Sequence, residues 1–169
     1  LMIILISVNK NNLKVVMDKY GPIIEKAMKD QMANDSGYSS TYPNRNASGR
    51  TAQSIKTKTF DRRGNIGIEV AGGYGLKFLH TGRRPGAKPP EVSVIEDWMN
   101  RKGIPPKYGS IKKSAGTIAF FIGKNGFKGS NIFGKAMGRI GGKLLSETAE
   151  AYIKDVEQHL KKTSKYARD

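Results

Sequence analysis

The chain contains no cysteine and only two histidines among its 169 residues. The lack of cysteine excludes disulfides, thiolate catalysis and cysteine-ligated zinc or iron–sulfur sites, and it fits assembly in a reducing compartment. His80 and His159 lie far apart in the sequence, and the acids nearest to His80 are Glu69 and Glu91. A catalytic or metal-binding histidine needs carboxylates or a nucleophile close by. We therefore expect no enzyme, no metal site and no cofactor, and we expect His80 to hydrogen-bond within a turn.

Long apolar runs are also lacking. The run Leu1–Ile6 is far shorter than the roughly 20 residues that a membrane-spanning helix needs. It has neither the cationic region nor the small-residue cleavage site of a signal peptide. We expect no transmembrane segment, and we interpret residues 1–9 as an N-terminal arm on a neighbouring subunit or as a buried edge strand.

Acidic residues are scarce. The net charge is +16, from 30 Lys or Arg against 14 Asp or Glu, and no acid occurs between Asp97 and Glu147. A block of one sign indicates either a polyanionic partner or a merely solvated basic face. The basic residues of this acid-free block are Arg101, Lys102, Lys107, Lys112, Lys113, Lys124, Lys128, Lys135, Arg139 and Lys143.

Apolar spacing predicts several helices. From Asn12 to Met32 apolar residues recur every three or four positions, and Gly21-Pro22 is expected to kink or split this helix. A mid-chain helix carrying Trp98 on its apolar face is expected to end at Gly103, because glycine favours a helix C-terminus. Two more helices are predicted, with Ser114 and Asn131 as their caps, the last one running to Leu160.

Alternating apolar residues predict a β-hairpin. Thr51–Phe60 and Ile66–Val70 flank a turn rich in Asp, Gly and Asn. Residues 33–49 have no period and are interpreted as a flexible loop, and residues 161–169 as a basic C-terminal tail. The order of elements predicts an α+β fold with a small antiparallel sheet. The N-terminal helix, a mid-chain helix and a long C-terminal helix would pack on that sheet.

One domain is expected over residues 1–169, because a chain of this length is too short for two comfortable domains. The segment Tyr74–Pro90 is the stretch around which this domain is expected to be organised. Its apolar first half, Tyr74–Leu79, needs a core to pack on and would form a further strand. Its second half is rich in Gly, Pro and Arg, which suits a presented basic loop.

The basic loops contain the candidate phosphate contacts. Such contacts position a nucleic acid without reading its sequence. No zinc finger, RNA-recognition signature or basic-zipper pattern accompanies them, so base reading has no support. The candidates are Arg83, Arg84, Lys88, Lys124 and Lys128.

The start of the last predicted helix matches part of a phosphate-binding P-loop. Gly129–Lys135 has the right spacing, but Ala136 stands where Ser or Thr would hold magnesium, and no apolar strand precedes it. We therefore expect no nucleotide. Gly134, Gly138 and Gly142 would form a bare stripe, which either permits close contact between helices of two subunits or simply loosens the helix.

Taken in order, four segments of residues 10–160 resemble the neck and tail-completion (minor tail, head–tail joining) proteins of long-tailed bacteriophages. Each motif is weak by itself, and their order and spacing carry the resemblance. Arg50-Thr51 departs from a Leu-containing motif that is usual in the family, and Ile132 stands where Pro often stands. The four segments are Ala47–Ile55, Tyr74–Gly82, Pro89–Ile104 and Ile118–Gly129, the last followed by Phe133–Ala136.

The resemblance implies a virion structural protein assembled in the host cytoplasm. It implies a homo-oligomeric ring, often a hexamer, at the head–tail junction between portal (connector) and tail proteins. Genomic double-stranded DNA would pass through its channel without sequence-specific contacts. Candidate subunit-interface residues are Phe127, Ile132, Phe133, Gly134 and Gly138.

Two other functions stay open at this stage. One is a sequence-independent nucleic-acid-binding protein, such as a chromatin protein of a host or mobile element. The other is a small phage enzyme, which the missing catalytic cluster disfavours. Neither the number of subunits in a ring nor the neighbouring proteins, the host or the tail length follows from the sequence.

Overall fold

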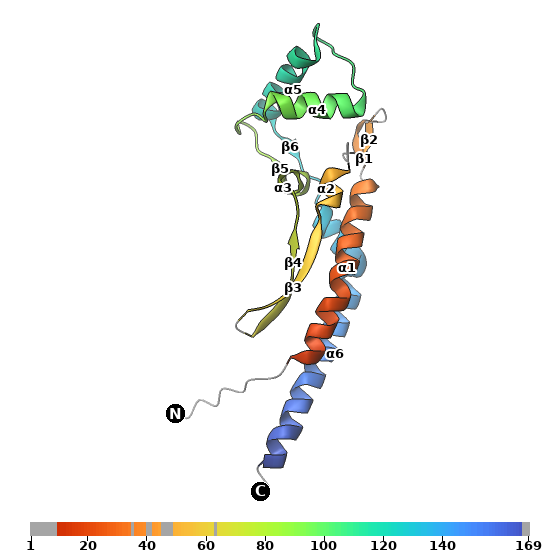
Figure 1. The fold of residues 1–169 in the computed structure, drawn as a ribbon, viewed down its shortest axis with the longest axis vertical. Helices are drawn as coiled ribbons and strands as arrows, with labels where there is room; N and C mark the ends of the chain where they lie inside the picture. The colour runs from red at the N-terminus through yellow and green to blue at the C-terminus, as the bar shows by residue number, and fades with distance from the viewer. Residues whose placement is uncertain (1–9, 35, 40–41, 45–48, 63, 167–169) are drawn as a thin grey trace. The chain divides into compact units, whose positions relative to one another are not determined.

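The structure, a computed structural model, describes residues 10–34, 36–39, 42–44, 49–62 and 64–166, so the expected arm at residues 1–9 lies outside the described residues. Helices and short paired strands alternate in the described part, and the expected α+β class is confirmed (Figure 1). The elements are α1 Asn11–Ala33, β1 Ser36–Ser39, β2 Tyr42–Asn44, α2 Arg50–Gln53, β3 Lys56–Arg62, β4 Asn65–Ala71, α3 Tyr74–Thr81, β5 Gly82–Arg83, α4 Val92–Lys102, α5 Ile111–Asn125, β6 Phe127–Lys128 and α6 Ile132–Tyr166.

The chain forms two compact units. That they belong to one domain over residues 1–169 stays a prediction. Each of the long helices α1 and α6 is divided between the two units. Neither unit is therefore continuous in the sequence. Sequence length alone could not reveal this division. Unit 1 comprises Leu1–Lys26, Thr57–Val70 and Met137–Asp169, and unit 2 comprises Ala27–Lys56 and Ala71–Ala136.

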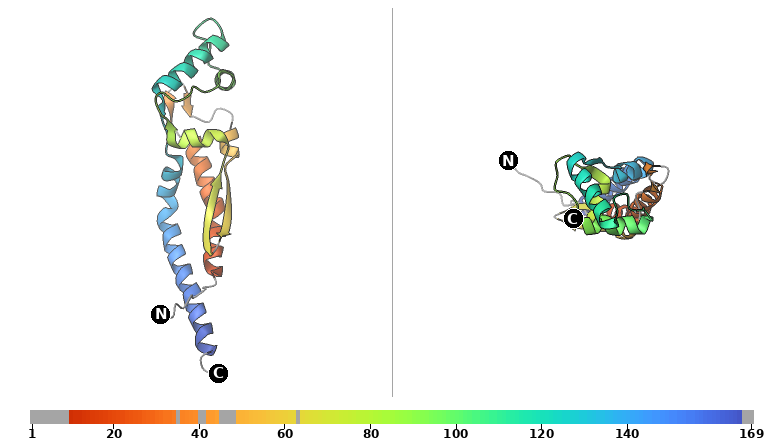
Figure 2. Two further views of the ribbon diagram at one scale, coloured as in Figure 1. Left: turned by 90° about the vertical axis from the view of Figure 1, so that its left-hand side faces the viewer. Right: turned by 90° about the horizontal axis from the view of Figure 1, so that it is seen from above.

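In unit 1 the first half of α1 lies between α6 and the β3–β4 hairpin (Figure 2). Tyr20 and Ile24 are buried on one stripe of α1. Gly21 lets the hairpin approach, since a Cβ there would lie 3.3 Å from the Thr57 hydroxyl oxygen. The backbone N–H of Thr57 donates to Glu25 at 3.1 Å. Pro22 therefore sits inside one continuous helix, and the expectation that it might split the helix is wrong.

Asp155 on α6 caps the start of α1. Its carboxylate is 1% exposed and accepts the backbone N–H groups of Asn12 at 2.9 Å and Leu13 at 3.0 Å. The side-chain amide of Asn12 donates to the same carboxylate at 2.8 Å. The first N–H groups of any helix lack partners within that helix. A buried carboxylate that satisfies two of them therefore joins α6 to α1.

The predicted hairpin is present as β3 and β4, but its first strand begins later than expected. Residues Arg50–Gln53 form the short helix α2. Gly49, with φ 74°, precedes it, and the N–H of Gln53 donates to the Gly49 carbonyl at 2.8 Å. Along β3, Thr57 and Thr59 are partly buried while Lys56 and Lys58 are exposed. The hairpin thus covers one face, as the alternation predicts.

In unit 2, α4 and α5 form a helical hairpin around one apolar cluster of Ile95, Met99, Ala115 and Ala119. Trp98 packs against this cluster, so its predicted core role is confirmed. Gly103 ends α4 in the left-handed conformation, as expected.

The predicted cap of α5 is wrong. Ser110 caps the helix by accepting the N–H of Lys113 at 3.2 Å. Ser114 is buried instead, and its hydroxyl oxygen accepts the N–H groups of Lys107 and Tyr108, both at 3.0 Å. Ser114 therefore holds the connector between α4 and α5.

Three other segments differ from the sequence-based predictions. Residues 33–49 contain the antiparallel strands β1 and β2, paired through Ser36↔Asn44 and Ser39↔Tyr42. Tyr74–Thr81 is the helix α3 and not a strand, and its Tyr74 and Phe78 rings meet edge to face at 5.0 Å across one turn. The C-terminal helix continues through residues 161–166, which were predicted as a tail.

Candidate functional site: a basic surface on unit 2

The basic surface is built on the short antiparallel pair β5–β6. Gly82 pairs with Lys128 and Arg83 with Phe127. The N–H of Gly86 donates to the Gly123 carbonyl at 2.8 Å. Residues 82–88 therefore lie directly against residues 123–128, although some 40 positions separate them in the sequence.

Two glycines make this close approach possible. Gly126 has φ 63°, and a Cβ there would lie 2.7 Å from the backbone nitrogen of Pro85. Gly82 has φ 80°, and its Cβ would overlap the carbonyl oxygen of Phe127. Side chains other than glycine rarely adopt such backbone angles. The glycine-rich composition of both loops thus serves to bring two backbones together.

Four exposed cations lie on these two adjoining segments, and we call them the basic surface: Arg84, Lys88, Lys124 and Lys128. The structure thus brings together four of the five predicted phosphate contacts. Cations gathered from two loops raise the local positive potential more than either loop does alone.

Arg83, the fifth candidate, is turned toward the protein. Its guanidinium lies over the Phe78 ring, 4.9 Å from the centroid, and donates to the backbone carbonyl of Lys88. Its Nε atom is buried and has no hydrogen-bond partner. Arg83 therefore closes the loop of residues 83–88 on α3 and holds it in place. That Arg83 also contacts phosphate stays a prediction.

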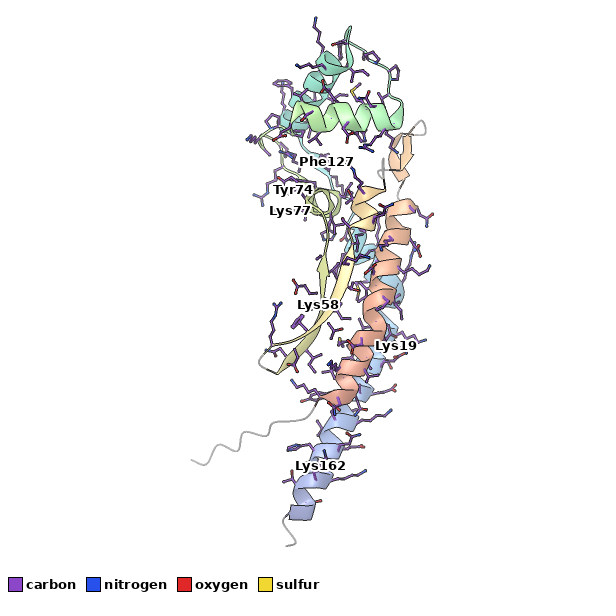
Figure 3. The ribbon with its side chains drawn as sticks, in the orientation of Figure 1. Lys19, Lys58, Tyr74, Lys77, Phe127 and Lys162 are labelled. Carbon is purple, nitrogen blue, oxygen red and sulfur yellow. The ribbon has the colours of Figure 1, made fainter. Side chains whose placement is uncertain are left out.

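Phe78 and Lys77 were missed by the sequence-based prediction. Phe78 was assigned to an apolar strand, and only the helical form of α3 shows that its ring supports Arg83. Lys77 is exposed on the same helix, in the region where Tyr74 and Phe127 also lie (Figure 3). A strand prediction for Tyr74–Leu79 hides the contact of Phe78 and the placement of Lys77, because side-chain directions differ between strand and helix.

The residues of the partial P-loop already bond within the protein. The N–H of Ser130 donates to the Leu79 carbonyl at 2.8 Å, and the N–H of Asn131 donates to the His80 carbonyl at 3.1 Å. A P-loop binds phosphates through free backbone N–H groups. The arrangement of these two amides is unlike that of a phosphate-binding loop.

His80 packs against an aromatic ring. Its ring centroid lies 6.5 Å from that of Phe133, edge to face, and its Nδ1 atom is buried without a hydrogen-bond partner. The Nδ1 atom therefore does not make the hydrogen bond within a turn that the sequence led us to expect of His80. No group of three or more His, Asp or Glu side chains suited to a metal ion occurs among the described residues.

The predicted interface residues divide into buried and exposed groups. Ile132 is 1% exposed, so its interface role is corrected to a core role. Phe127 is partly buried in β6, and Phe133 is 40% exposed. Gly134 is exposed, and its Cα lies close against the Asn131 side chain. Gly138 has open space around it, because a Cβ there would meet no atom within 4 Å.

Positive charge is concentrated in unit 2. This unit contains 16 Lys or Arg and 5 Asp or Glu, whereas unit 1 contains 14 and 9. Of the net charge of +16, unit 2 therefore carries +11 and unit 1 carries +5. Some of these cations are paired within the protein, as Arg50 and Arg101 are with Asp97 at 2.7 and 2.9 Å.

Within the residues that the structure describes, every helix is too short or too polar to cross a membrane. Comparisons of this chain with protein-family models, with characterised proteins and with solved structures find no match.

Proposed function

We propose that this chain is a structural virion protein of a tailed bacteriophage, forming a ring at the head–tail junction around the DNA channel. The four ordered motifs listed above, which resemble neck and tail-completion proteins, suggest the class. The single structural observation that supports it best is the basic surface of Arg84, Lys88, Lys124 and Lys128.

This surface suits passing DNA for a physical reason. Lysine and arginine contacts to phosphate attract a duplex whatever its sequence. Backbone pairing between residues 82–88 and 123–128 gives the cations a defined support, so the loops need not order when DNA arrives. The proposed role is therefore to line a channel and not to bind one site tightly.

A sequence-independent nucleic-acid-binding protein is the second candidate. The concentration of charge in unit 2 favours it, because a net charge of +11 on one unit would attract DNA without any ring. Light scattering after size-exclusion chromatography separates the two functions. Discrete particles whose mass is a multiple of 18.6 kDa support the virion protein, while a monomer with steep salt-dependent DNA affinity supports the second candidate.

The role of the basic surface is tested by salt dependence of duplex DNA binding. We expect Arg84→Ala, Lys88→Ala, Lys124→Ala and Lys128→Ala, combined in one variant, to lower the slope of log affinity against log salt by about 3–4. The matched control replaces Lys58, Lys154, Lys161 and Lys162, which are exposed on unit 1, by alanine. An equal loss in both variants would show that overall charge, and not this surface, attracts the DNA.

A further inference from the structure

Helix α6 exposes an apolar stripe that nothing in the described chain covers. At about 3.6 residues per turn, Leu145, Ala149 and Tyr152 align along one side of the helix, with Ile153 and Leu160 beside them. The exposed fractions are 71% for Leu145, 49% for Tyr152 and 55% for both Ile153 and Leu160. We call these five residues the α6 stripe. The opposite side of the helix, with Ala151 and Asp155, is the buried one.

The α6 stripe lies in an acidic stretch of a basic chain. Residues 145–160 contain four of the chain's 14 acidic residues and a single lysine. Asp155 and Glu147 bond to α1, so the acids that face outward are Glu150 and Glu157. These two are exposed about two helical turns apart, next to the stripe. A surface that covers the stripe should therefore be apolar at its centre and basic around it.

Helix α5 has a surface of that kind. Phe120 and Phe121 are 56% and 48% exposed, and their rings meet edge to face at 5.6 Å. Lys112 and Lys113 are exposed on the same helix, and α5 contains no Asp or Glu. Lys113 and Phe120 lie on one side of the helix about two turns apart, and Lys112 and Phe121 flank that side in opposite directions. We call these four residues the α5 face. Because the two rings pack against each other, they form an apolar knob and not a flat platform for stacking bases.

We propose that the α5 face of one copy of this chain docks on the α6 stripe of the next copy. The phenylalanines would cover the apolar centre, and the lysines would lie near Glu150 and Glu157. Pairing two α5 faces would bring only cations to the contact, and pairing two α6 stripes would bring Glu150 and Glu157 of both copies to it, so charge favours the mixed pairing of an α5 face with an α6 stripe. The contact therefore joins two different surfaces, head to tail, and such a contact generates a ring when its rotation closes.

This inference rests on the proposed ring function and names the surfaces that would build the ring. Lys124 of the basic surface lies on α5 within about one turn of the two phenylalanines. The variants below leave all four cations of the basic surface in place, so the two proposals can be tested apart. Two double variants each disrupt one of the two surfaces. Phe120→Ser with Phe121→Ser removes the apolar part of the α5 face, and Tyr152→Ser with Ile153→Ser removes the centre of the α6 stripe. All four side chains are about half exposed, so each variant should keep the circular dichroism and melting temperature of the wild type.

The experiment measures particle mass by light scattering over a concentration series. We expect the wild type to assemble and each double variant alone to remain a monomer of 18.6 kDa. A mixture of the two variants should form a 1:1 dimer and nothing larger, because one intact contact remains. As a charge test, Lys112→Glu with Lys113→Glu should weaken assembly, and adding Glu150→Lys with Glu157→Lys should restore it.

Several outcomes would overturn the inference. A wild-type assembly that both double variants preserve would refute these surfaces while leaving the ring function standing. If the α6-stripe variant or the α5-face variant dimerises by itself, the contact is not head to tail. A wild type that stays monomeric at every concentration would refute self-docking and remove the ring from the proposed function as well.

Discussion

Arg83 shows how a charged residue can make contacts within the protein that its charge alone does not reveal. It lies in a run of cations, yet its guanidinium stacks on Phe78 and bonds to the Lys88 carbonyl. Arginine suits this role because its planar guanidinium can stack on a ring while its N–H groups donate in the plane, whereas the compact lysine ammonium has no flat face to stack. These contacts join the loop that carries Arg84 and Lys88 to α3.

The first prediction follows from this geometry. Arg83→Lys keeps the positive charge but removes the guanidinium that stacks on the Phe78 ring. Because the loop that carries Arg84 and Lys88 would then be held less firmly, we expect duplex DNA affinity to fall about fivefold, which corresponds to about 1 kcal/mol. Hydrogen exchange of the Gly86 amide, which bonds to Gly123, should become faster. The control Arg84→Lys should leave both quantities nearly unchanged. If the Arg83→Lys variant keeps the DNA affinity and the Gly86 exchange rate of the wild type, Arg83 acts through its charge alone.

Asp155 is the second residue whose role depends on position. Asp155→Ala would leave the N–H groups of Asn12 and Leu13 without an acceptor in a part-buried site. We expect the free energy of unfolding to fall by about 1–3 kcal/mol, the cost of unsatisfied buried donors. Urea denaturation measures this, with exposed Gln158→Ala on the same helix as the control. A loss no larger than that of the control would mean that water replaces the carboxylate.

At the scale of elements, α1 and α6 are also joined by a titratable cluster. Lys19 donates to Glu147 at 2.6 Å, and the hydroxyl of buried Tyr20 donates to it at 3.1 Å. The hydrogen bond from Lys19, followed by that from Tyr20 and by the nearby positive charges, lowers the pKa of Glu147. The lowered pKa means that the ionised carboxylate stabilises the folded state.

The sign of the pH dependence follows from that direction. Because the folded pKa of Glu147 lies below its unfolded value of about 4.3, its contribution is complete above that pH and disappears as pH falls through the folded pKa. We therefore expect Glu147→Gln to melt at a lower temperature than the wild type at pH 7. The difference in melting temperature should become smaller as the pH falls into the acidic range. Thermal melts from neutral to acidic pH measure this, and Glu150→Gln is the control. A difference in melting temperature that does not change with pH would contradict the stabilising role of the ionised Glu147 carboxylate.

The α4–α5 hairpin depends on its local apolar cluster. Met99 is 1% exposed at the centre of that cluster. We expect Met99→Ala to cost about 2–5 kcal/mol of unfolding free energy, because it removes buried volume that the surrounding helices cannot refill. Hydrogen exchange should show the loss in α4 and α5 first. Exposed Val94→Ala on α4 should change little, and equal effects would argue against a core at Met99.

At the scale of the whole molecule, charge and not base recognition should govern nucleic-acid binding. Unit 2 carries a net charge of +11. We expect two duplexes of equal length and unrelated sequence to bind within about twofold of each other, since phosphate contacts carry no sequence information. Fluorescence anisotropy at several salt concentrations measures both affinities. A preference of tenfold or more would indicate base contacts and contradict the proposed channel role.

Local patterns sufficed for much of the fold. Apolar spacing placed α1, α4 and α6, and alternation placed the β3–β4 hairpin, because both periods depend on neighbouring residues alone. The same reasoning failed for α3, where Tyr74–Leu79 was taken for a strand. In so short a segment the two periods cannot be told apart, and packing decides.

The sequence by itself determined the composition of the candidate site: five candidate cations in two glycine-rich loops, without cysteine or a histidine cluster. Only the tertiary structure decided that these loops lie side by side, that Arg83 faces Phe78, and that Ile132 is buried. The physical reason is that helix and strand periods are local properties of the chain. Pairing between residues some 40 positions apart depends on which backbones can approach, and at Gly82 and Gly126 only a residue without a Cβ permits that approach.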